Sequence, residues 1–290
     1  MNDSQALGDR KIRQTGQSAR VASKLFTYCV LIFASALCLA PIVWVILSSF
    51  KTNAEIISGT MLPTSLTLSG YSYALNLAPF PTFFMNSVFI STIAMLLNVT
   101  FVSMGAYIFA RRNFRMKEVL FSVFMAAMVL PATALIQPVY MQIRSLGLIN
   151  TRRGLILVYM CFGMPVGLMI MRSFFAAIPR DMEDSAAIDG AGFVRTFVQI
   201  IVPIAKPGIA TIMVLRFLEY WNEFTYALVL TTSTNIRTMP LSLGYFVAAF
   251  SFNYTALFAA IVLSVLPALL LFAAFNESVV NSMTIGAVKG

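Results

Sequence analysis

Residues 178–208 read IPRDMEDSAAIDGAGFVRTFVQIIVPIAKPG, and this polar segment joins two long apolar stretches, 154–171 and 207–230. Pro179 is followed by three carboxylates within one helical turn, which suits the positive end of a helix dipole. Asp189-Gly190 is typical of a turn or a helix C-cap. The segment is therefore expected to begin with a short helix that ends in a sharp bend near Gly190.

The second part of this segment is amphipathic. Its apolar residues recur at roughly helical spacing, and Pro203 and Pro207 close it before the next apolar stretch. The carboxylates of the first part are Asp181, Glu183 and Asp184. We expect two short helices on the surface of the protein, where such a structured knob can insert into a groove of a soluble partner.

The rest of the chain is mostly apolar. Of its 290 residues 59% are hydrophobic and 11% are charged, whereas soluble domains carry about 45–50% apolar and about 25% charged residues. A helix needs about 20 apolar residues to cross a bilayer core. Six stretches approach or exceed this length: 25–49, 84–109, 119–141, 154–171, 207–230 and 255–275. The sequence therefore predicts an all-α integral membrane protein with six transmembrane helices and lipid as its surroundings.

The Lys and Arg residues indicate the orientation. With a cytoplasmic N-terminus, fourteen of the twenty lie in cytoplasmic segments, five lie outside and Arg216 lies within a span. Lys and Arg are enriched in cytoplasmic loops, so both termini are expected in the cytoplasm. The chain then divides into a cytoplasmic tail (1–24), an uncleaved first span (25–49), a core (80–276) and a second cytoplasmic tail (277–290).

Several classes of function are excluded by composition. The chain has no histidine, which excludes Ser-His-Asp triads, histidine zinc ligands and imidazole proton relays. The net charge is +9, but the basic residues form short clusters between apolar stretches, so no nucleic-acid partner is expected. Cys29, Cys38 and Cys161 lie within apolar stretches, and we expect buried free thiols.

Five prolines interrupt the predicted spans. Each removes a backbone hydrogen bond and can kink its helix, which favours a packed bundle around a path over straight anchors. Proline is also simply commoner in membrane helices than in soluble ones, so each position taken alone stays ambiguous. The residues are Pro41, Pro131, Pro138, Pro165 and Pro267.

The segment 178–208 resembles the EAA loop of the permease subunits of ABC importers, which reads EAAxxDGA followed by IxLP. Asp184-Ser185-Ala186 occupies the EAA position, Asp189-Gly190 follows in register, and Pro203 ends the closing element. Asp184 stands in place of Glu and Ser185 in place of Ala, and both replacements are chemically close. The resemblance implies that this loop docks in a cleft of an ATPase subunit and couples nucleotide-driven closure to the spans.

Further stretches resemble the carbohydrate, MalG-type subset of this binding-protein-dependent family. They are Leu146–Thr151, the Trp221-Asn222-Glu223-Phe224 sequence and the ending Gly286–Gly290. The resemblance implies an ABC transporter type-1 permease fold in the bacterial inner membrane. It implies four kinds of partner: a second, MalF-type permease, an ATPase dimer, an extracytoplasmic sugar-binding protein and the lipid bilayer. By analogy, the tail Gly286–Gly290 would reach between the ATPase subunits.

Charged residues lie inside the fifth predicted span. Arg216 and Glu219 are three residues apart, and Glu219 and Glu223 are four apart, so all three fit one helix face. Intramembrane charges are costly unless they are paired or wet. One interpretation is a polar strip along a translocation path, together with Trp221 and Asn222. The other is a structural ion pair, or a position near the water interface.

Three hypotheses about function remain. A permease subunit has no catalysis of its own, and ATP is bound by a partner, since the chain lacks the phosphate-binding pattern GxxxxGK followed by Ser or Thr. A secondary transporter would work without an ATPase, but it would leave the EAA-like loop unexplained. A membrane enzyme would need clustered catalytic residues, which this sequence does not contain. We expect the permease, with neither a cofactor nor a metal of its own.

Overall fold

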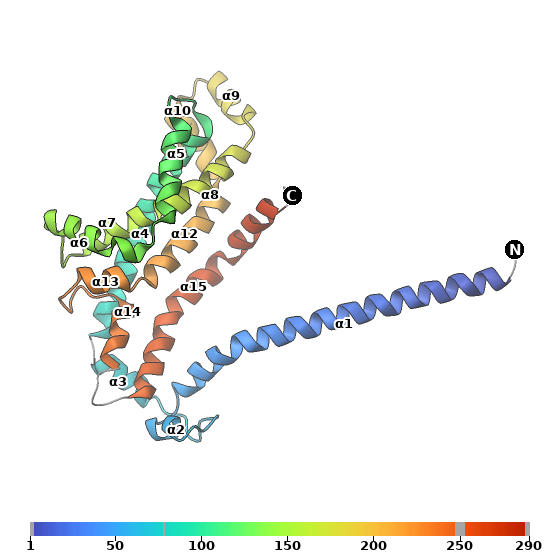
Figure 1. The fold of residues 1–290 in the computed structure, drawn as a ribbon, viewed down its shortest axis with the longest axis horizontal. Coiled ribbons are helices and arrows are strands. Elements are labelled where there is room, and N and C mark those ends of the chain that lie inside the picture. The colour runs from blue at the N-terminus through green and yellow to red at the C-terminus, as the bar shows by residue number, and fades with distance from the viewer. Residues whose placement is uncertain (1–2, 78, 247–252, 288–290) are drawn as a thin grey trace.

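The computed structural model describes residues 3–77, 79–246 and 253–287, with side chains described over 23–76, 79–244, 246 and 253–274. Every regular element within these ranges is a helix. Figure 1 shows an elongated bundle from which α1 (Asp3–Ser48) extends as a long rod. The expected all-α fold is confirmed, whereas the orientation of the termini in the membrane stays a prediction.

Two further helices are long enough to cross a membrane unaided. They are α4 (Phe80–Arg111) and α15 (Tyr254–Ala287), each with an apolar composition like that of α1 after Ser23. In α1 the apolar window has no buried residue, against 44% in α4 and 17% in α15. The core of the molecule is therefore built around α4, while most of the apolar surface of α1 is left uncovered by the described residues.

Three bent pairs of helices could each form one further span, so the described part of the chain holds three straight spans or up to six in all. The bends measure 97°, 47° and 77°. The pairs are formed by α5 (Lys117–Ala126), η1 (Ala127–Val129), η2 (Ala132–Leu135) and α6 (Ile136–Ser145); by α7 (Arg152–Phe162) and α8 (Met164–Ala177); and by α10 (Phe193–Thr196), η3 (Phe197–Ile201), α11 (Val202–Ile204) and α12 (Lys206–Trp221).

Proline accounts for two of these breaks. Leu130 and Pro131 both adopt extended backbone at the sharpest bend, as expected for a proline and the residue before it. Pro165 lies in the first turn of α8, just after the second bend. Pro41 and Pro267, in contrast, lie inside continuous helices. A proline there leaves one backbone carbonyl of the preceding turn without its N–H partner, and a membrane helix can continue when a neighbouring group takes that place.

The expected fifth span, 207–230, is not one helix. It consists of α12 and a short α13 (Thr225–Leu230), with residues 222–224 between them. The Glu223 carboxylate accepts the backbone N–H groups of Tyr226 and Ala227. Side-chain acceptors of this kind satisfy the free donors of a helix start, so a second helix begins where an unbroken span was expected.

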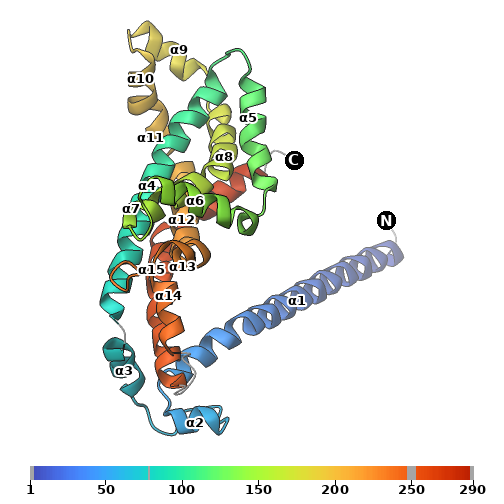
Figure 2. The same ribbon diagram turned by 60° about the vertical axis from the view of Figure 1, so that its left-hand side comes forward.

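The bundle has two distinct ends (Figure 2). One end, called the α9 end, carries α9 (Asp181–Ile188) and α10. The opposite end, called the α2 end, carries α2 (Asn53–Ile57) and α3 (Ser69–Leu77), and α14 (Met239–Ser242) and η4 (Leu243–Phe246) also lie on that side. Between the two ends α4 packs against α7, α8 and α12, and α15 packs against α12, α3 and α1.

The expected burial of the cysteines is wrong. Cys29, Cys38 and Cys161 are all free, as expected, but exposed. The error has a physical origin, because an apolar stretch in a membrane protein can face lipid or a partner as well as its own core. On α1 the exposed surface includes Phe26 and Phe33, and α1 meets the bundle at its α2 end, where the Trp44 and Phe258 rings lie 5.1 Å apart.

Candidate functional site

The charged strip of α12 holds an ion pair. Arg216 Nη1 lies 2.5 Å from Glu219 Oε2, and the Arg216 side chain is 6% exposed whereas that of Glu219 is 49% exposed. An isolated buried arginine would be costly in an apolar surrounding. The pair therefore neutralises Arg216 inside the bundle and leaves one partly exposed carboxylate beside it.

Glu223 is fully engaged in holding helices together. Besides the two backbone N–H groups of α13, its carboxylate accepts a hydrogen bond from the Tyr159 hydroxyl at 2.8 Å. Tyr159 belongs to α7. Glu223 thus fixes the start of α13 against α7, and of the three span-five charges it is the one with the most complete set of partners.

The neighbours Trp221 and Asn222 differ in their surroundings. Trp221 is 2% exposed, its indole N–H donates to Ser264 O at 3.0 Å, and its ring stacks on Phe217. It connects α12 with α15 and lies in the core. Asn222 is exposed, and its amide donates to Leu218 O in its own helix. Of these two residues, only Asn222 has a side chain that a passing molecule could reach.

A small cavity lies where the three broken spans meet. It has a volume of about 150 Å³. The Tyr226 hydroxyl closes one side by donating to Ala132 O at 2.8 Å. Its lining combines carboxylates, hydroxyls and aromatic rings: Ala132, Thr133, Val158, Tyr159, Phe162, Glu219, Tyr220, Glu223, Thr225 and Tyr226. Such a mixture can hydrogen-bond and stack on a polar, ring-shaped ligand.

Gly163, at the break between α7 and α8, allows this close packing. A Cβ atom there would lie 2.2 Å from the Tyr220 hydroxyl oxygen and 2.9 Å from Arg216 Cδ. Near the same break, the buried Asn98 of α4 donates to Met160 O at 2.7 Å. The absence of a side chain at residue 163 therefore brings α12 and α4 directly against the break.

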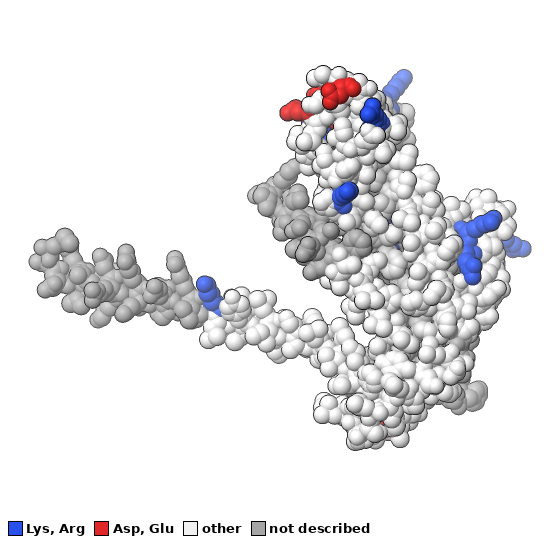
Figure 3. Space-filling model, turned by 180° about the vertical axis from the view of Figure 1, so that it is seen from behind, with Lys and Arg blue, Asp and Glu red and all other residues white. Residues whose placement is uncertain are grey.

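The segment 178–208 forms the α9 end, and it is called the coupling loop below after the role expected of it. Figure 3 shows acidic side chains gathered there. The first helix is α9, which starts with Asp181, and Gly190 adopts φ of 76° just after it. This left-handed backbone favours glycine. The expected pair of short helices with a bend at Asp189-Gly190 is thus confirmed.

Most of the motif residues lie on the surface of the coupling loop. Asp184, Ser185, Asp189 and Gly190 are exposed, whereas Ala186 is 4% exposed and faces inward. Pro203 belongs to α11. The structure therefore presents the polar part of the motif outward in one compact unit, available to a partner.

The coupling loop is attached to the end of α4. Arg111 Nε lies 2.6 Å from Glu183 Oε1, and Arg111 Nη2 donates to Ile178 O at 2.6 Å. The ring of Tyr107 stacks on both Phe193 and Phe197. These contacts tie both parts of the loop to one helix. In the sequence, Arg111 is only one of the basic residues that indicate orientation, since no local pattern shows that it pairs with a residue 72 positions away.

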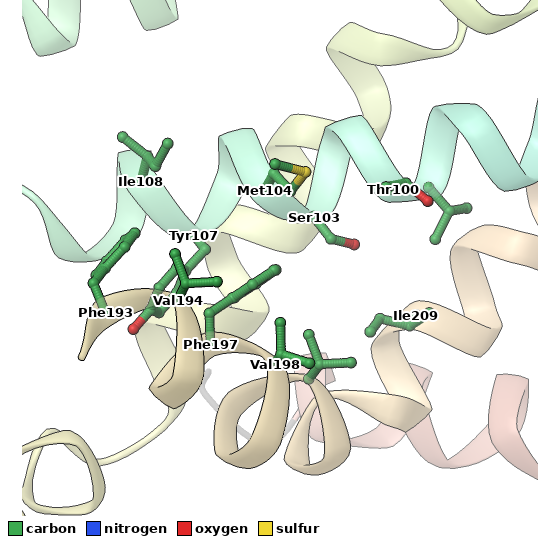
Figure 4. Close-up of a pocket in the computed structure, with 12 residues that line it drawn as sticks. Thr100, Ser103, Met104, Tyr107, Ile108, Phe193, Val194, Phe197, Val198 and Ile209 are labelled. Atoms are coloured by element: carbon green, nitrogen blue, oxygen red, sulfur yellow. The ribbon is translucent and has the colours of Figure 1, made fainter. Parts of the chain in front are cut away.

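An apolar groove of about 460 Å³ runs beside this attachment (Figure 4). Ser103, Met104 and Tyr107 line it from α4, and Phe197 and Val198 line it from the opposite side. The second part of the coupling loop therefore packs on α4 through the rings of Tyr107, Phe193 and Phe197, and the groove separates the two beyond these rings.

Residues 101–285 match the family described as binding-protein-dependent transport system inner membrane component. The chain belongs to this family. The permease is therefore a multi-pass inner-membrane protein, and its family consists of transport components rather than enzymes. The expected family is confirmed.

Curated relatives resemble the permease over most of its length. It is 32% identical to the diacetylchitobiose uptake system permease protein NgcG of Streptomyces coelicolor, over 96% of this chain and 93% of the relative. It is 32% identical to the sulfoquinovosyl glycerol transport system permease protein SmoH of Agrobacterium fabrum, over 87% and 89%. The trehalose/maltose transport system permease protein MalG of Thermococcus litoralis is 29% identical, over 89% and 94%.

A solved structure supports the fold. A chain from the crystal structure of a bacterial ABC transporter involved in the import of the acidic polysaccharide alginate superposes with a TM-score of 0.77, at 24% identity, over 90% of this permease and 97% of that chain. The permease thus has the fold of an ABC transporter membrane subunit.

The predicted contact of Gly286–Gly290 involves residues 288–290, which lie outside the described residues.

Proposed function

We propose that this permease forms half of the transmembrane path of an ATP-driven sugar importer, and that the coupling loop links it to an ATPase subunit. The sugar class rests on relatives whose names specify diacetylchitobiose, sulfoquinovosyl glycerol and trehalose/maltose transport. The coupling role rests on one observation above all. The polar motif residues Asp184 and Asp189 are exposed on a compact helical knob at the α9 end.

The proposed assembly contains the partners expected from the sequence. A second permease supplies the other half of the path, an ATPase dimer binds ATP, and an extracytoplasmic binding protein delivers the sugar. One solved relative of the fold is a bacterial alginate ABC transporter in complex with an alginate pentasaccharide-bound periplasmic protein. We place the binding protein at the α2 end, on the segments 51–83 and 232–254. Of the latter segment, residues 247–252 lie outside the described residues.

In the proposed mechanism ATP binding draws the coupling loop inward and opens the path outward. The sugar then enters the cavity at the three broken spans, where Glu219, Thr133 and Thr225 offer polar atoms. Glu219 is the preferred cargo contact because its side chain is half exposed. Glu223 and Trp221 position the helices around it. ATP hydrolysis resets the path.

The first experiment is a mild-detergent pull-down of the tagged permease with mass spectrometry of the proteins that accompany it. An ATPase with a phosphate-binding loop and a second permease are expected. A homodimer that transports in liposomes without ATP would instead establish the alternative, a secondary transporter.

Asp189→Lys is expected to abolish ATP-driven uptake while membrane insertion is retained, because it reverses the charge of the exposed motif. Wild-type uptake by this variant would overturn the docking role of the loop.

A further inference from the structure

We propose that α4 is a rigid rod that carries the motion of the coupling loop to the α2 end of the permease, with the Arg111–Glu183 ion pair as its attachment at the α9 end. The inference deepens the proposed function and rests on it, because it assumes that an ATPase moves the coupling loop. It assigns roles to Arg111, Asn98 and Asn86, none of which belongs to the motif of the loop.

α4 is the stiffest of the central spans. α4 runs without a break for 32 residues, which at about 1.5 Å per residue makes it about 48 Å long. Three of the other spans bend by 47° or more at a break, and bends can absorb movement. Among the described unbroken helices α1 and α15 are peripheral, whereas α4 is the most buried. It is therefore the helix best suited to pass a displacement from one end to the other (Figure 2).

At the α9 end, α4 is attached to the coupling loop through Arg111. The Arg111 side chain is 5% exposed and contacts the loop twice, through Glu183 in α9 and through Ile178 O at the start of the loop. An ion pair that is largely shielded from water is screened less by salt than an exposed pair, and the charge of Arg111 strengthens its hydrogen bond to Ile178 O. A displacement of α9 therefore pulls directly on the last turn of α4.

The part of the loop after Gly190 is attached to the same turns of α4. The Tyr107 ring lies 5.0 Å from that of Phe193 and 4.8 Å from that of Phe197. The Arg112 guanidinium lies 4.3 Å above the Phe193 ring. Because both parts of the loop are held by residues 107–112, the loop and the end of α4 move together whichever part the ATPase contacts.

At its opposite end, α4 is attached to neighbouring segments through Asn86. Asn86 is 2% exposed and donates to Asn235 O at 2.9 Å and to Arg237 O at 3.0 Å. Its side-chain oxygen accepts the Arg152 Nε–H at 2.9 Å. One turn of α4 thus holds the segment before α14 and the start of α7. Ser87 adds a hydrogen bond from the Met239 backbone N–H at 2.7 Å.

Midway along α4, Asn98 connects the rod to the cavity. Its amide donates to Met160 O, three residues before the break at Gly163. A shift of α4 along or about its axis therefore moves the α7–α8 break, which lines the cavity through Tyr159 and Phe162. The rod meets the loop, the cavity and the α2 end at three fixed points.

The test uses the complete complex, purified with its ATPase, second permease and binding protein and placed in lipid nanodiscs. The measured quantity is the ratio of ATP hydrolysis with and without the sugar-loaded binding protein. Arg111→Gln is expected to lower this ratio about tenfold, which corresponds to about 1.4 kcal/mol of coupling free energy. Arg111→Lys, which keeps the charge, is expected to retain part of the ratio.

If α4 acts as a rod, a change at either end lowers the same ratio, whereas damage confined to the coupling loop would not be reproduced by a change at the other end. Asn86→Ala, at the opposite end of α4, is expected to lower the same ratio, and the double variant with Arg111→Gln is expected to be no worse than either single variant, because both interrupt one path. Arg172→Gln is the matched control. It breaks an arginine–glutamate pair at 2.8 Å, with Glu118, that connects α8 to α5 without touching the loop, and the ratio should stay at the wild-type value.

A distance measurement completes the test. In a variant with Cys29, Cys38 and Cys161 replaced by alanine, spin labels are placed at the exposed positions Met85 on α4 and Leu37 on α1. Trapping with ATP and vanadate is expected to change the distance between them in the wild type and to leave it unchanged in Arg111→Gln. An Arg111→Gln complex with the wild-type ratio and distance change would overturn the rod alone. A wild-type permease that binds no ATPase would overturn the proposed function as well.

Discussion

At the scale of single residues, Gly163 decides how closely α12 approaches the α7–α8 break. Gly163→Ala places a methyl group 2.2 Å from the Tyr220 hydroxyl oxygen, and overpacking of this kind costs about 1–3 kcal/mol. We expect a lower melting temperature in detergent and slower uptake. Adding Tyr220→Phe should recover part of the loss. Gly244→Ala, where a Cβ meets nothing within 4 Å, should melt like the wild type.

Glu223 and Asn222 are neighbours with opposite expected sensitivities. Glu223→Ala removes the acceptor for the Tyr159 hydroxyl and for two N–H groups of α13, at about 1–3 kcal/mol for each buried group left unpaired. Glu223→Gln keeps one acceptor oxygen and should melt between Glu223→Ala and the wild type. Asn222→Ala loses only a hydrogen bond within its own helix and should change the melting temperature little. Equal melting of all three variants would contradict this structural role of Glu223.

At the scale of an element, α2 depends on one carboxylate. Glu55 accepts hydrogen bonds from the Thr64 hydroxyl and N–H and from the Thr52 N–H and hydroxyl. The Thr64 hydroxyl is the main cause of a Glu55 pKa lowered from 4.5 to about 2. Because the folded pKa is the lower one, the carboxylate stabilises this segment fully above pH 4.5, and the contribution is lost as the pH falls toward 2.

A spin label at Leu66, which is 78% exposed, reports on this segment. Its mobility should rise as the pH is lowered from 4.5 toward 2 and return when the pH is restored. In Glu55→Gln the label should be mobile already at pH 7, with little further change on acidification. A label whose mobility is independent of pH in the wild type would show that the carboxylate does not hold the segment.

At the scale of the whole molecule, the orientation of the bundle can be tested with cysteines. In a variant with Cys29, Cys38 and Cys161 replaced by alanine, Leu66→Cys and Ile188→Cys place thiols at the α2 end and the α9 end. Both positions are exposed. A membrane-impermeant maleimide should label residue 66 in intact cells and residue 188 only after permeabilisation. The reverse pattern would overturn the orientation inferred from the Lys and Arg residues.

The apolar stretches predicted the helices because a helix is the structure in which a single stretch satisfies all its backbone hydrogen bonds by itself inside a bilayer. The stretch 84–109 became part of one helix, and the polar segment 178–208 became two short helices with a bend at Gly190. Apolarity does not tell lipid from protein, however. The same kind of stretch has no buried residue in the most apolar part of α1 and is nearly half buried in α4, and the cysteines were misassigned for this reason.

The sequence by itself determined the membrane-spanning helical class, the two short helices within 178–208 and the family, since these depend on local composition and short motifs. Only the tertiary structure decided which charges are paired, where span five breaks and what Glu223 holds. Arg111 pairs with Glu183 across 72 residues, and hydrogen bonds join Tyr159 to Glu223 across 64 residues and Asn86 to Arg237 across 151. Contacts over such separations depend on the packing of distant helices against each other, which no local pattern encodes.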